Sequence, residues 1–440
     1  MDVSLINQAL AQGNLDVHGV FPHVEQLAKA PFIFPVEFGL TELPREPGVI
    51  TIRGARQYGK STWLEQQIRF TIQKFGPGSC FYLNGDEIPR PQDLTEAISS
   101  LIAGFSSRAA VKRLFIDEIT AVEGWTGALK RLLDSGTLRD VLVVTTGSRA
   151  HDLRRGTERL PGRKGRLGRT TYLFTPISFR AFRDTCGDRL GEKLLPAYLL
   201  SGGSPIALGE LASQESLPAY VIELVRDWVY GECAAAGRSR AAVMAVLEYL
   251  VRHGGDPIGQ AKLARETGLA NNTVAAGYIE FLADLLCVGQ SLVWDAARHI
   301  RLPRKPVKYP FINLLAAVAW HPLHPRALDD FGRLPESTQG MFLEWAVAQE
   351  IWRRRALSGD ELPELLTFWQ TQEHEIDYMV RPDRFVEVKR GAVTPLEFAW
   401  FARSFPKGQL LVVNPRRFET SHVRGLTLED FLLADTWFND

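Results

Sequence analysis

The sequence contains few cysteines, no excess of either charge and no long hydrophobic run. Its four cysteines, Cys80, Cys186, Cys233 and Cys287, stand far apart without paired spacing. That excludes a disulfide framework or a cysteine-rich zinc site and fits a reducing compartment. Lysine and arginine total 51 and so do aspartate and glutamate, which excludes a strongly basic or acidic chain. Any surface for a polyanion must therefore be a local patch.

The sequence predicts neither a secretory signal nor a membrane-spanning helix. The most apolar stretch, residues 311–320, is about half as long as a helix that crosses a bilayer. The N-terminus lacks a basic stretch leading into an apolar run, so we expect a cytoplasmic protein. The 45% apolar content is that of a chain that folds, and 440 residues suggest about three domains.

Short β-rich runs alternate with helical stretches from Gly48 to Pro176. Five strands are expected, at residues 49–54, 79–85, 112–118, 141–147 and 170–176. Strands that are apolar on both faces, with helices between them, predict a parallel α/β sheet.

The strongest motif follows the first of these strands and matches G-x-x-x-x-G-K-[ST]. It comprises Gly54, Ala55, Arg56, Gln57, Tyr58, Gly59, Lys60, Ser61 and Thr62. Glycines let backbone amides wrap a phosphate, and the following helix adds its N-terminal dipole. Lys60 is expected to reach the β- and γ-phosphates, and Ser61 to bind Mg²⁺.

Two acids end the third strand. Asp117 is expected to hold the Mg²⁺ site and Glu118 to polarise the attacking water. Acid pairs after strands are common, and the phosphate loop upstream is what makes this pair informative.

Polar residues also end the fourth strand, where Ser148 is a candidate sensor of the γ-phosphate or an ordinary strand cap. The loop at residues 149–170 carries eight basic residues and two acids. It is either a solvated loop or the source of an arginine, Arg163 or failing that Arg166, that acts on a neighbouring subunit.

Residues 243–295 have the pattern helix, helix, turn, helix, strand, which suits a helix-turn-helix with a wing. Asn271 or Asn272 is expected to cap the third helix, whose exposed side lacks lysine and arginine. Residues 296–308 carry five basic residues and no acid, so this loop could contact DNA phosphates. The alternative is a packing module.

The last segment has the spacing D-x₉-E-x-K at Asp377, Glu387 and Lys389, with Glu344 on a preceding helix. This resembles the PD-(D/E)xK nuclease pattern, in which Asp377 and Glu387 would bind Mg²⁺ or Mn²⁺. The alternative is a degenerate domain without a metal.

Strand parity makes this hypothesis testable. A two-residue turn at Pro382–Asp383 would place Asp377 opposite Val388, so Glu387 and Lys389 would lie on the wrong face. A metal site shared by Asp377 and Glu387 needs an odd number of residues in the turn or a β-bulge in the ladder.

These motifs, together with Thr146-Gly147-Ser148, Pro161-Gly162-Arg163 and Pro176 to Phe179, resemble the AAA-type P-loop ATPases that carry a DUF4143 C-terminal region. The resemblance covers nearly the whole chain from about residue 18, with Asn313 where that family usually has aspartate. It implies an AAA+ core joined to a winged helix and a nuclease-like domain. The expected segments are an N-terminal helical extension at 1–45, the ATPase core at 46–176, a helical lid at 177–237, the winged helix at 238–330 and the nuclease-like domain at 331–440.

The resulting hypothesis is an ATP- and Mg²⁺-dependent ATPase that couples its nucleotide state to the two C-terminal modules, acts on DNA and could form a homo-oligomer. A metal-dependent DNase activity is an open part of it. The rival is a nucleotide-gated switch or scaffold whose nuclease-like domain is inactive and binds a protein partner.

Overall fold

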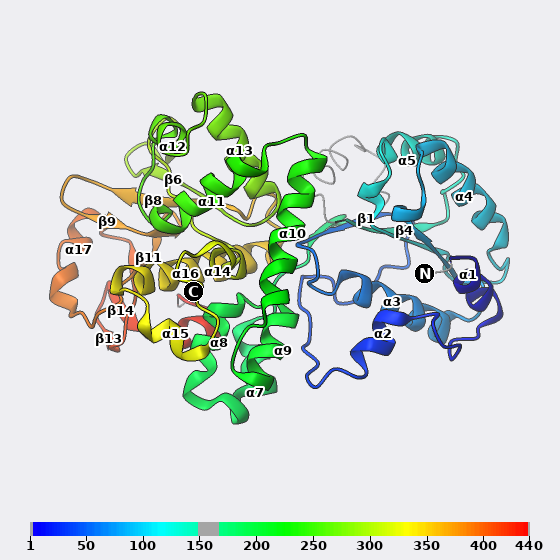
Figure 1. Ribbon diagram of the computed structural model, residues 1–440, viewed down its shortest axis with the longest axis horizontal. Helices are drawn as coiled ribbons and strands as arrows, with labels where there is room; N and C mark the ends of the chain where they lie inside the picture. Colours follow the sequence, from blue (N-terminus) through cyan, green and yellow to red (C-terminus); the bar gives the residue numbers. More distant parts are fainter. Residues whose placement is uncertain (1–2, 148–166, 439–440) are drawn as a thin grey trace. The chain divides into compact units, whose positions relative to one another are not determined.

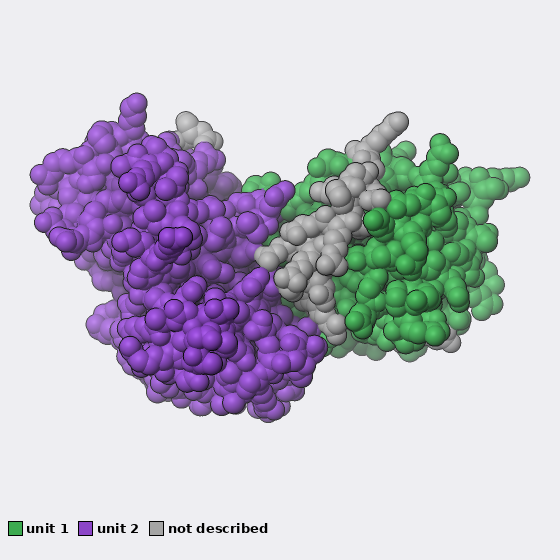
Figure 2. All heavy atoms as spheres, turned by 90° about the horizontal axis from the view of Figure 1, so that it is seen from above, with its two compact units in different colours: residues 1–175, 357–359 green, residues 176–356, 360–440 purple. Residues whose placement is uncertain are grey.

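The computed structural model describes residues 3–147 and 167–438. The described chain divides into two compact units (Figure 2). Unit 1 contains residues 1–175 and 357–359, and unit 2 contains residues 176–356 and 360–440. None of the helices in the described ranges is long and apolar enough to cross a membrane.

Unit 1 is built on a five-stranded sheet with the order β2-β3-β4-β1-β5, in which every pairing is parallel. The strands are β1 (Gly48–Arg53), β2 (Cys80–Asn84), β3 (Arg113–Asp117), β4 (Leu142–Gly147) and β5 (Thr171–Leu173). Strands β1, β3 and β4 are buried along their whole length, as their apolar sequences predict for a sheet covered on both faces. The predicted α/β class of a P-loop ATPase is therefore confirmed, and further sheets follow in unit 2.

Helices cover both faces of this sheet (Figure 1). The helical elements between the strands are α3 (Lys60–Phe75), η1 (Gly85–Glu87), α4 (Pro91–Gly104), η2 (Ile119–Ala121) and α5 (Trp125–Asp134). Helices α4 and α5 lie on one face, where Ile98 and Leu129 pack with Leu114 and Val143 of the strands. Helix α3 lies on the other face and ends at Phe75, and it is followed by Gly76, whose φ of +83° favours glycine.

The N-terminal segment packs on the same unit through α1 (Val3–Gln12) and α2 (Pro22–Leu27). The side-chain amide of Asn7 donates to the carbonyl of Tyr82 at 2.8 Å and accepts from the Tyr82 N–H at 2.8 Å. It therefore satisfies both backbone groups on the open edge of β2. At α2, Glu65 of α3 contacts His23 Nδ1 at 2.6 Å and accepts from the Val24 N–H at 3.0 Å.

Unit 2 begins with a helical segment. Its elements are α7 (Phe179–Leu190), η3 (Gly191–Lys193), α8 (Leu194–Ser201), α9 (Pro205–Gln214) and α10 (Ala219–Ala235). Gly202 and Gly203 separate α8 from α9 with φ values of +58° and +75°. A Cβ atom at Gly202 would lie 2.7 Å from the Leu315 nitrogen, so this break requires glycine for space as well as for conformation.

Three helices and a hairpin follow. They are α11 (Arg240–His253), α12 (Gln260–Glu266), α13 (Asn272–Asp284), β6 (Gln290–Asp295) and β7 (Ile300–Leu302). Asn271 caps α13 because its side chain accepts a hydrogen bond from the Val274 N–H. Strand β6 pairs antiparallel with β7 and parallel with β8 (Leu365–Gln370). With β9 (Glu375–Ile376) these strands form a sheet with the order β7-β6-β8-β9. Strand β6 therefore shares a sheet with strands of the C-terminal segment.

The remaining helices are α14 (Leu314–Trp320), α15 (Leu328–Arg333), α16 (Glu336–Ser358), η4 (Pro395–Phe398), α17 (Phe401–Ser404) and α18 (Leu428–Leu433). Asn313 caps α14 by accepting from the Ala316 N–H. Helix α16 runs through the interior of unit 2, where Trp345 and Trp352 are at most 2% exposed.

The C-terminal sheet has the order β10-β11-β12-β14-β13. The strands after α16 are β8 (Leu365–Gln370), β9 (Glu375–Ile376), β10 (Tyr378–Arg381), β11 (Arg384–Val388), β12 (Gln409–Val413), β13 (Phe418–Glu419) and β14 (Val423–Leu426). Strands β11, β12 and β14 are parallel to one another, and β10 and β13 run antiparallel to their neighbours. An aromatic core that includes Phe385 and Phe401 closes one face of this sheet.

Candidate functional site

The phosphate loop joins β1 to α3 in a conformation that glycine makes possible. Gly59 lies at the start of α3 with a φ of +98°, and Gln57 also has a positive φ of +62°. A Cβ atom at Gly54 would lie 2.7 Å from the Cβ of Phe174, so no larger residue fits at the start of the loop. Glycine is therefore required at both ends of the phosphate loop, for space at Gly54 and for backbone conformation at Gly59.

Lys60 is held inside this loop. Its ammonium donates to the carbonyls of Gly54 at 2.9 Å and Ala55 at 2.8 Å, and the residue is 7% exposed. Ser61 and Thr62 follow in the first turn of α3 and are half-buried, whereas Arg56 and Gln57 are exposed. The loop thus carries a buried positive charge beside the first turn of a helix, where anions bind.

The two acids at the end of β3 are held by β4. The Thr146 hydroxyl donates to Asp117 Oδ1 and accepts from the Glu118 N–H at 3.0 Å. The Glu118 N–H also lies 3.1 Å from Asp117 Oδ1, and Glu118 has a φ of +45°, in the left-handed region. Because β4 lies between β1 and β3 in a parallel sheet, the carboxyl ends of all three strands meet at one edge. The acids and the phosphate loop therefore share that edge.

Thr146 is the polar residue at the end of β4 that the structure connects to the acids. The candidate sensor Ser148 and the arginines Arg163 and Arg166 lie outside the described residues. The sequence showed several polar residues at the end of this strand, and the candidate chosen from them was Ser148 rather than Thr146.

A second group of polar residues lies in unit 2. Strands β10 and β11 pair Arg381 with Arg384 across a two-residue turn, and Met379 with Phe385 beyond it. The register shifts between these pairs, so the ladder carries the bulge that the parity argument allowed. With the shift, the Asp377 N–H donates to Glu387 Oε2 at 3.1 Å. The two carboxylates therefore lie together.

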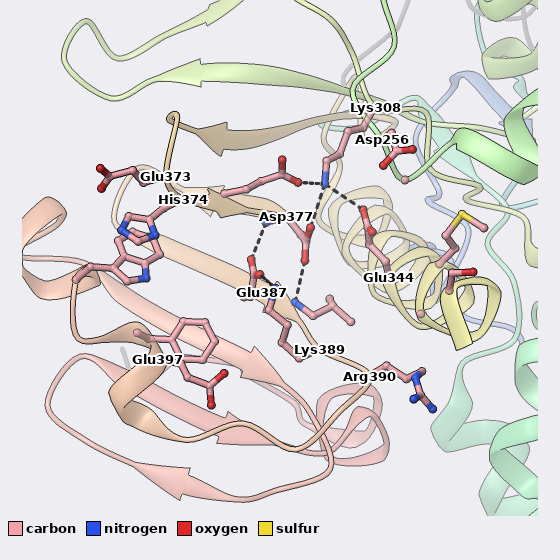
Figure 3. Close-up of a pocket in the computed structure, with 18 residues that line it drawn as sticks. Asp256, Lys308, Glu344, Glu373, His374, Asp377, Glu387, Lys389, Arg390 and Glu397 are labelled. Carbon is pink, nitrogen blue, oxygen red and sulfur yellow. Dashed lines mark hydrogen bonds and ion pairs between the residues drawn. The ribbon is translucent and has the colours of Figure 1, made fainter. Parts of the chain in front are cut away.

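Lys308 lies at the centre of this group (Figure 3). Its Nζ is 2.5 Å from Glu375 Oε1, 3.0 Å from Asp377 Oδ1 and 3.5 Å from Glu344 Oε1. The lysine side chain is 2% exposed. Lys308 was expected to contact phosphates with the rest of the 296–308 loop; that expectation is wrong, because the side chain points inward and is paired three times.

Lys389 pairs with the remaining carboxylate. Its Nζ lies 2.5 Å from Glu387 Oε1, and its side chain is 46% exposed. The second oxygen of Asp377 accepts from the Val388 N–H at 2.9 Å. The structure therefore brings Glu344, Asp377, Glu387 and Lys389 into one place and adds Lys308, which no spacing rule indicated because it lies 69 residues before Asp377.

Burial controls the charge of these groups. It raises the pKa of Glu344 to about 8, with Asp377 adding to the effect and Lys308 opposing it. Burial likewise raises the pKa of Glu387 to about 8, again supported by Asp377 and opposed by Lys389. For Lys308, burial alone would lower the pKa, but Asp377, Glu344 and Glu375 raise it well above its ordinary value. The ammonium is therefore the stable form.

A cavity of about 520 Å³ opens beside these residues. Asp256, His374, Arg390 and Trp400 also line it. The rings of His374 and Trp400 stack at 4.0 Å with an angle of 3° between their planes. Within residues 3–147 and 167–438, no group of three or more histidine, cysteine, aspartate or glutamate side chains is placed to hold a metal ion.

The loop before Lys308 is exposed and basic. Four of its residues, Arg298, Arg301, Arg304 and Lys305, are exposed. Because these residues surround the β6–β7 hairpin, the hairpin carries a local positive patch on a chain with no net charge.

Comparison with known proteins supports the class of unit 1. Residues 46–183, about a third of the chain, match the family model of an AAA domain. With the phosphate loop and the acid pair on one parallel sheet, these residues form the nucleotide-binding domain of an AAA-type P-loop ATPase.

Solved structures with distant similarity include the Walker-type ATPase PABY2304 of Pyrococcus abyssi. It is 12% identical, with 69% of this chain and 96% of that chain covered and a TM-score of 0.42. Cdc6p from Pyrobaculum aerophilum is 14% identical, with coverages of 62% and 88% and a TM-score of 0.27. The replication initiator DnaA bound to AMPPCP and single-stranded DNA is 11% identical, with coverages of 60% and 86% and a TM-score of 0.28. At these TM-scores the likenesses support no assignment of substrate or partner. No curated protein matches the sequence.

Proposed function

We propose that the chain is a Mg²⁺-dependent ATPase whose nucleotide state governs the binding activity of unit 2. The observation that carries the proposal is the network of Asp117, Glu118 and Thr146 at the sheet edge that also bears the phosphate loop. In this arrangement Asp117 would bind the metal and Glu118 would activate the water beside the phosphates of a bound nucleotide.

The residues present fit MgATP. Lys60 has a buried ammonium that donates to two carbonyls of its own loop, and phosphate oxygens would compete with them for it. Ser61 and Asp117 would hold Mg²⁺, which when bound neutralises charge on the phosphates. Glu118 would accept a proton from the attacking water, and Thr146 holds the Glu118 peptide in place.

Hydrolysis of ATP by the purified chain tests this proposal. The Lys60→Ala variant removes the charge that faces the phosphates, so ATP affinity should fall about 10- to 100-fold. Lys74→Ala is the matched control, because Lys74 lies on the same helix and pairs at the surface with Glu42. A Lys60→Ala variant that binds and hydrolyses ATP like the parent would contradict the proposal.

We further propose that unit 2 contacts DNA through the exposed basic residues of the 296–308 loop. Support comes from the order of α11, α12, α13 and the β6–β7 hairpin, which is that of a winged helix, and from the positive patch on the hairpin. Replacing Arg298, Arg301, Arg304 and Lys305 with alanine should weaken binding to duplex DNA and flatten its salt dependence. The control replaces four other exposed basic residues of unit 2, Arg381, Arg403, Lys407 and Arg416. Equal losses in both variants would show that the loop has no special role.

A homo-oligomer is part of the same proposal. The motif Pro161-Gly162-Arg163 and the basic composition of the 149–170 loop support an arginine that acts on a neighbouring subunit. ATPase activity per molecule should then rise with protein concentration. Full activity of a monomer at every concentration would refute this part.

The second candidate is a nucleotide-gated switch or scaffold whose nuclease-like segment cuts no DNA and binds a protein partner. A divalent metal in that segment does not fit the residues present, because the buried ammonium of Lys308 occupies Asp377, a carboxylate that would bind it. Plasmid incubated with the protein, ATP and either Mg²⁺ or Mn²⁺ should therefore stay intact. Plasmid cleavage that is lost when Asp377 is replaced would contradict this candidate and support a metal-dependent nuclease.

A further inference from the structure

Lys308 is surrounded as a bound cation would be. Its ammonium contacts carboxylates from three separate elements: Glu344 of α16, Glu375 of β9 and Asp377 between β9 and β10. An ammonium has three N–H donors, and three carboxylate oxygens lie within 3.5 Å of it. The arrangement satisfies the lysine and draws together acids that would otherwise repel one another.

The side chain of Lys308 is held in the carboxylate pocket by its surroundings. Its backbone exchanges hydrogen bonds with Ser291 of β6, at 3.0 Å from the Lys308 nitrogen and 2.8 Å to the Lys308 oxygen. Its Nζ also lies 5.4 Å from the centre of the buried Phe368 ring on β8. Both ends of the residue are therefore fixed to the β6–β8 pair, and the side chain is 2% exposed although it lines the cavity.

Lys389 differs in this respect. It also pairs with a carboxylate of the group, but its side chain is 46% exposed and can swing into solvent. A metal ion could displace Lys389 without unfolding anything. It could not displace Lys308 in that way.

From this geometry we propose that the ammonium of Lys308 is the resident cation of the carboxylate pocket and takes the place of a divalent metal ion. A divalent ion on Asp377 would lie against a like charge that cannot move away. The pocket of unit 2 therefore keeps its shape without metal. The inference deepens the second candidate function and rests on its metal-free pocket, but it does not depend on ATP hydrolysis.

Binding of Mn²⁺ alone, measured by calorimetry on nucleotide-free full-length protein, tests the inference. All proteins carry Asp117→Asn, which removes the acid of the proposed nucleotide-linked metal site. The protein with Lys308 intact should bind no Mn²⁺ that depends on Asp377. Lys308→Met keeps an unbranched apolar side chain as far as Cε and removes the ammonium, so it should gain one Mn²⁺ site. That site should disappear when Asp377→Asn is added, and Lys389→Met, the matched control, should gain none.

Two results would overturn the inference: Asp377-dependent Mn²⁺ binding while Lys308 is intact, or a folded Lys308→Met variant that binds no Mn²⁺. If Lys308→Met unfolds without metal, recovery of its thermal transition by Mn²⁺ supports the inference, and failure to recover counts against it. ATPase activity, measured separately on chains that retain Asp117, decides the proposed function. The two can therefore fail independently.

Discussion

At the scale of single residues, the best-defined feature is how Thr146 positions two acids. Its hydroxyl bonds both the Asp117 carboxylate and the Glu118 N–H. Glu118 has a left-handed backbone, which costs on the order of 1 kcal/mol for a residue other than glycine. Gly85 makes room for it, because a Cβ there would collide with the Glu118 carbonyl oxygen. The surrounding groups therefore hold an unfavourable conformation, as is common at functional sites.

Glu118→Gln should leave ATP affinity unchanged and lower kcat about 10²- to 10⁴-fold. The amide keeps the size of the side chain but cannot accept the proton of the attacking water. Steady-state hydrolysis and equilibrium nucleotide binding measure the two quantities. Turnover at the parental rate would mean that another group is the base.

Thr146→Val should lower kcat by about 10- to 100-fold, because two hydrogen bonds at the acid pair are lost without a change in size. Thr146→Ser keeps the hydroxyl and should restore most of the rate. Comparing kcat of the two variants separates positioning from packing, since serine disturbs packing more than valine does. If serine were the slower of the two, the hydroxyl would have no role.

At the scale of secondary-structure elements, edge protection explains why α1 belongs to unit 1. Strand β2 is the edge of the five-stranded sheet, and its unpaired backbone groups would offer a site for aggregation. Asn7 satisfies the N–H and the carbonyl of Tyr82 at that edge. An amide side chain can do so because it carries one donor group and one acceptor, like a neighbouring strand.

Asn7→Ala should reduce the stability of unit 1 by about 1–3 kcal/mol, since two backbone groups lose their partners. Gln8→Ala is the control, because Gln8 lies on the exposed side of the same helix. Urea unfolding of both variants measures the difference. Equal midpoints would show that water replaces the Asn7 amide without cost.

At the scale of the whole molecule, the chain carries no net charge, so its response to pH depends on individual buried groups. His321 is 3% exposed and accepts a hydrogen bond from the Leu323 N–H at Nδ1. Burial lowers the pKa of His321 to about 4, and the neighbouring His324 and Arg252 lower it further. A proton on Nδ1 would also remove the acceptor.

The stability of unit 2 should therefore decline as the pH falls from about 6.5 toward 4. In this range the unfolded chain binds a proton that the folded chain rejects. The contribution of His321 is fully present above pH 6.5, and its loss by pH 4 amounts to roughly 2–4 kcal/mol. Thermal unfolding across this range should show a shallower decline for His321→Asn than for the exposed control His299→Asn, because His299 does not affect the pKa of His321. Identical slopes would mean that His321 is charged in the folded state.

The sequence alone determined the features that depend on neighbouring residues. The phosphate loop, the acid pair after an apolar strand and the alternation of strands and helices all follow from local pattern, because backbone conformation and strand burial are set within a few residues. Fold class and the nucleotide-binding loop could therefore be predicted. Parity also predicted that the hairpin of Asp377 and Glu387 needs either an odd turn or a bulge.

Only the tertiary structure decided whether the hairpin uses an odd turn or a bulge, and which residues contact the acids of the two sites. It selected the bulge between Met379 and Arg381, and it brought Thr146 to Asp117. It also showed that Lys308, which the sequence predicted to contact phosphates, lies at the centre of the carboxylate pocket. No local pattern reports such a contact, because it depends on β6 and β8 pairing across 75 residues of chain. The carboxylates around Lys308 come from α16, from β9 and from the residue between β9 and β10, so only the folded chain brings them to the lysine.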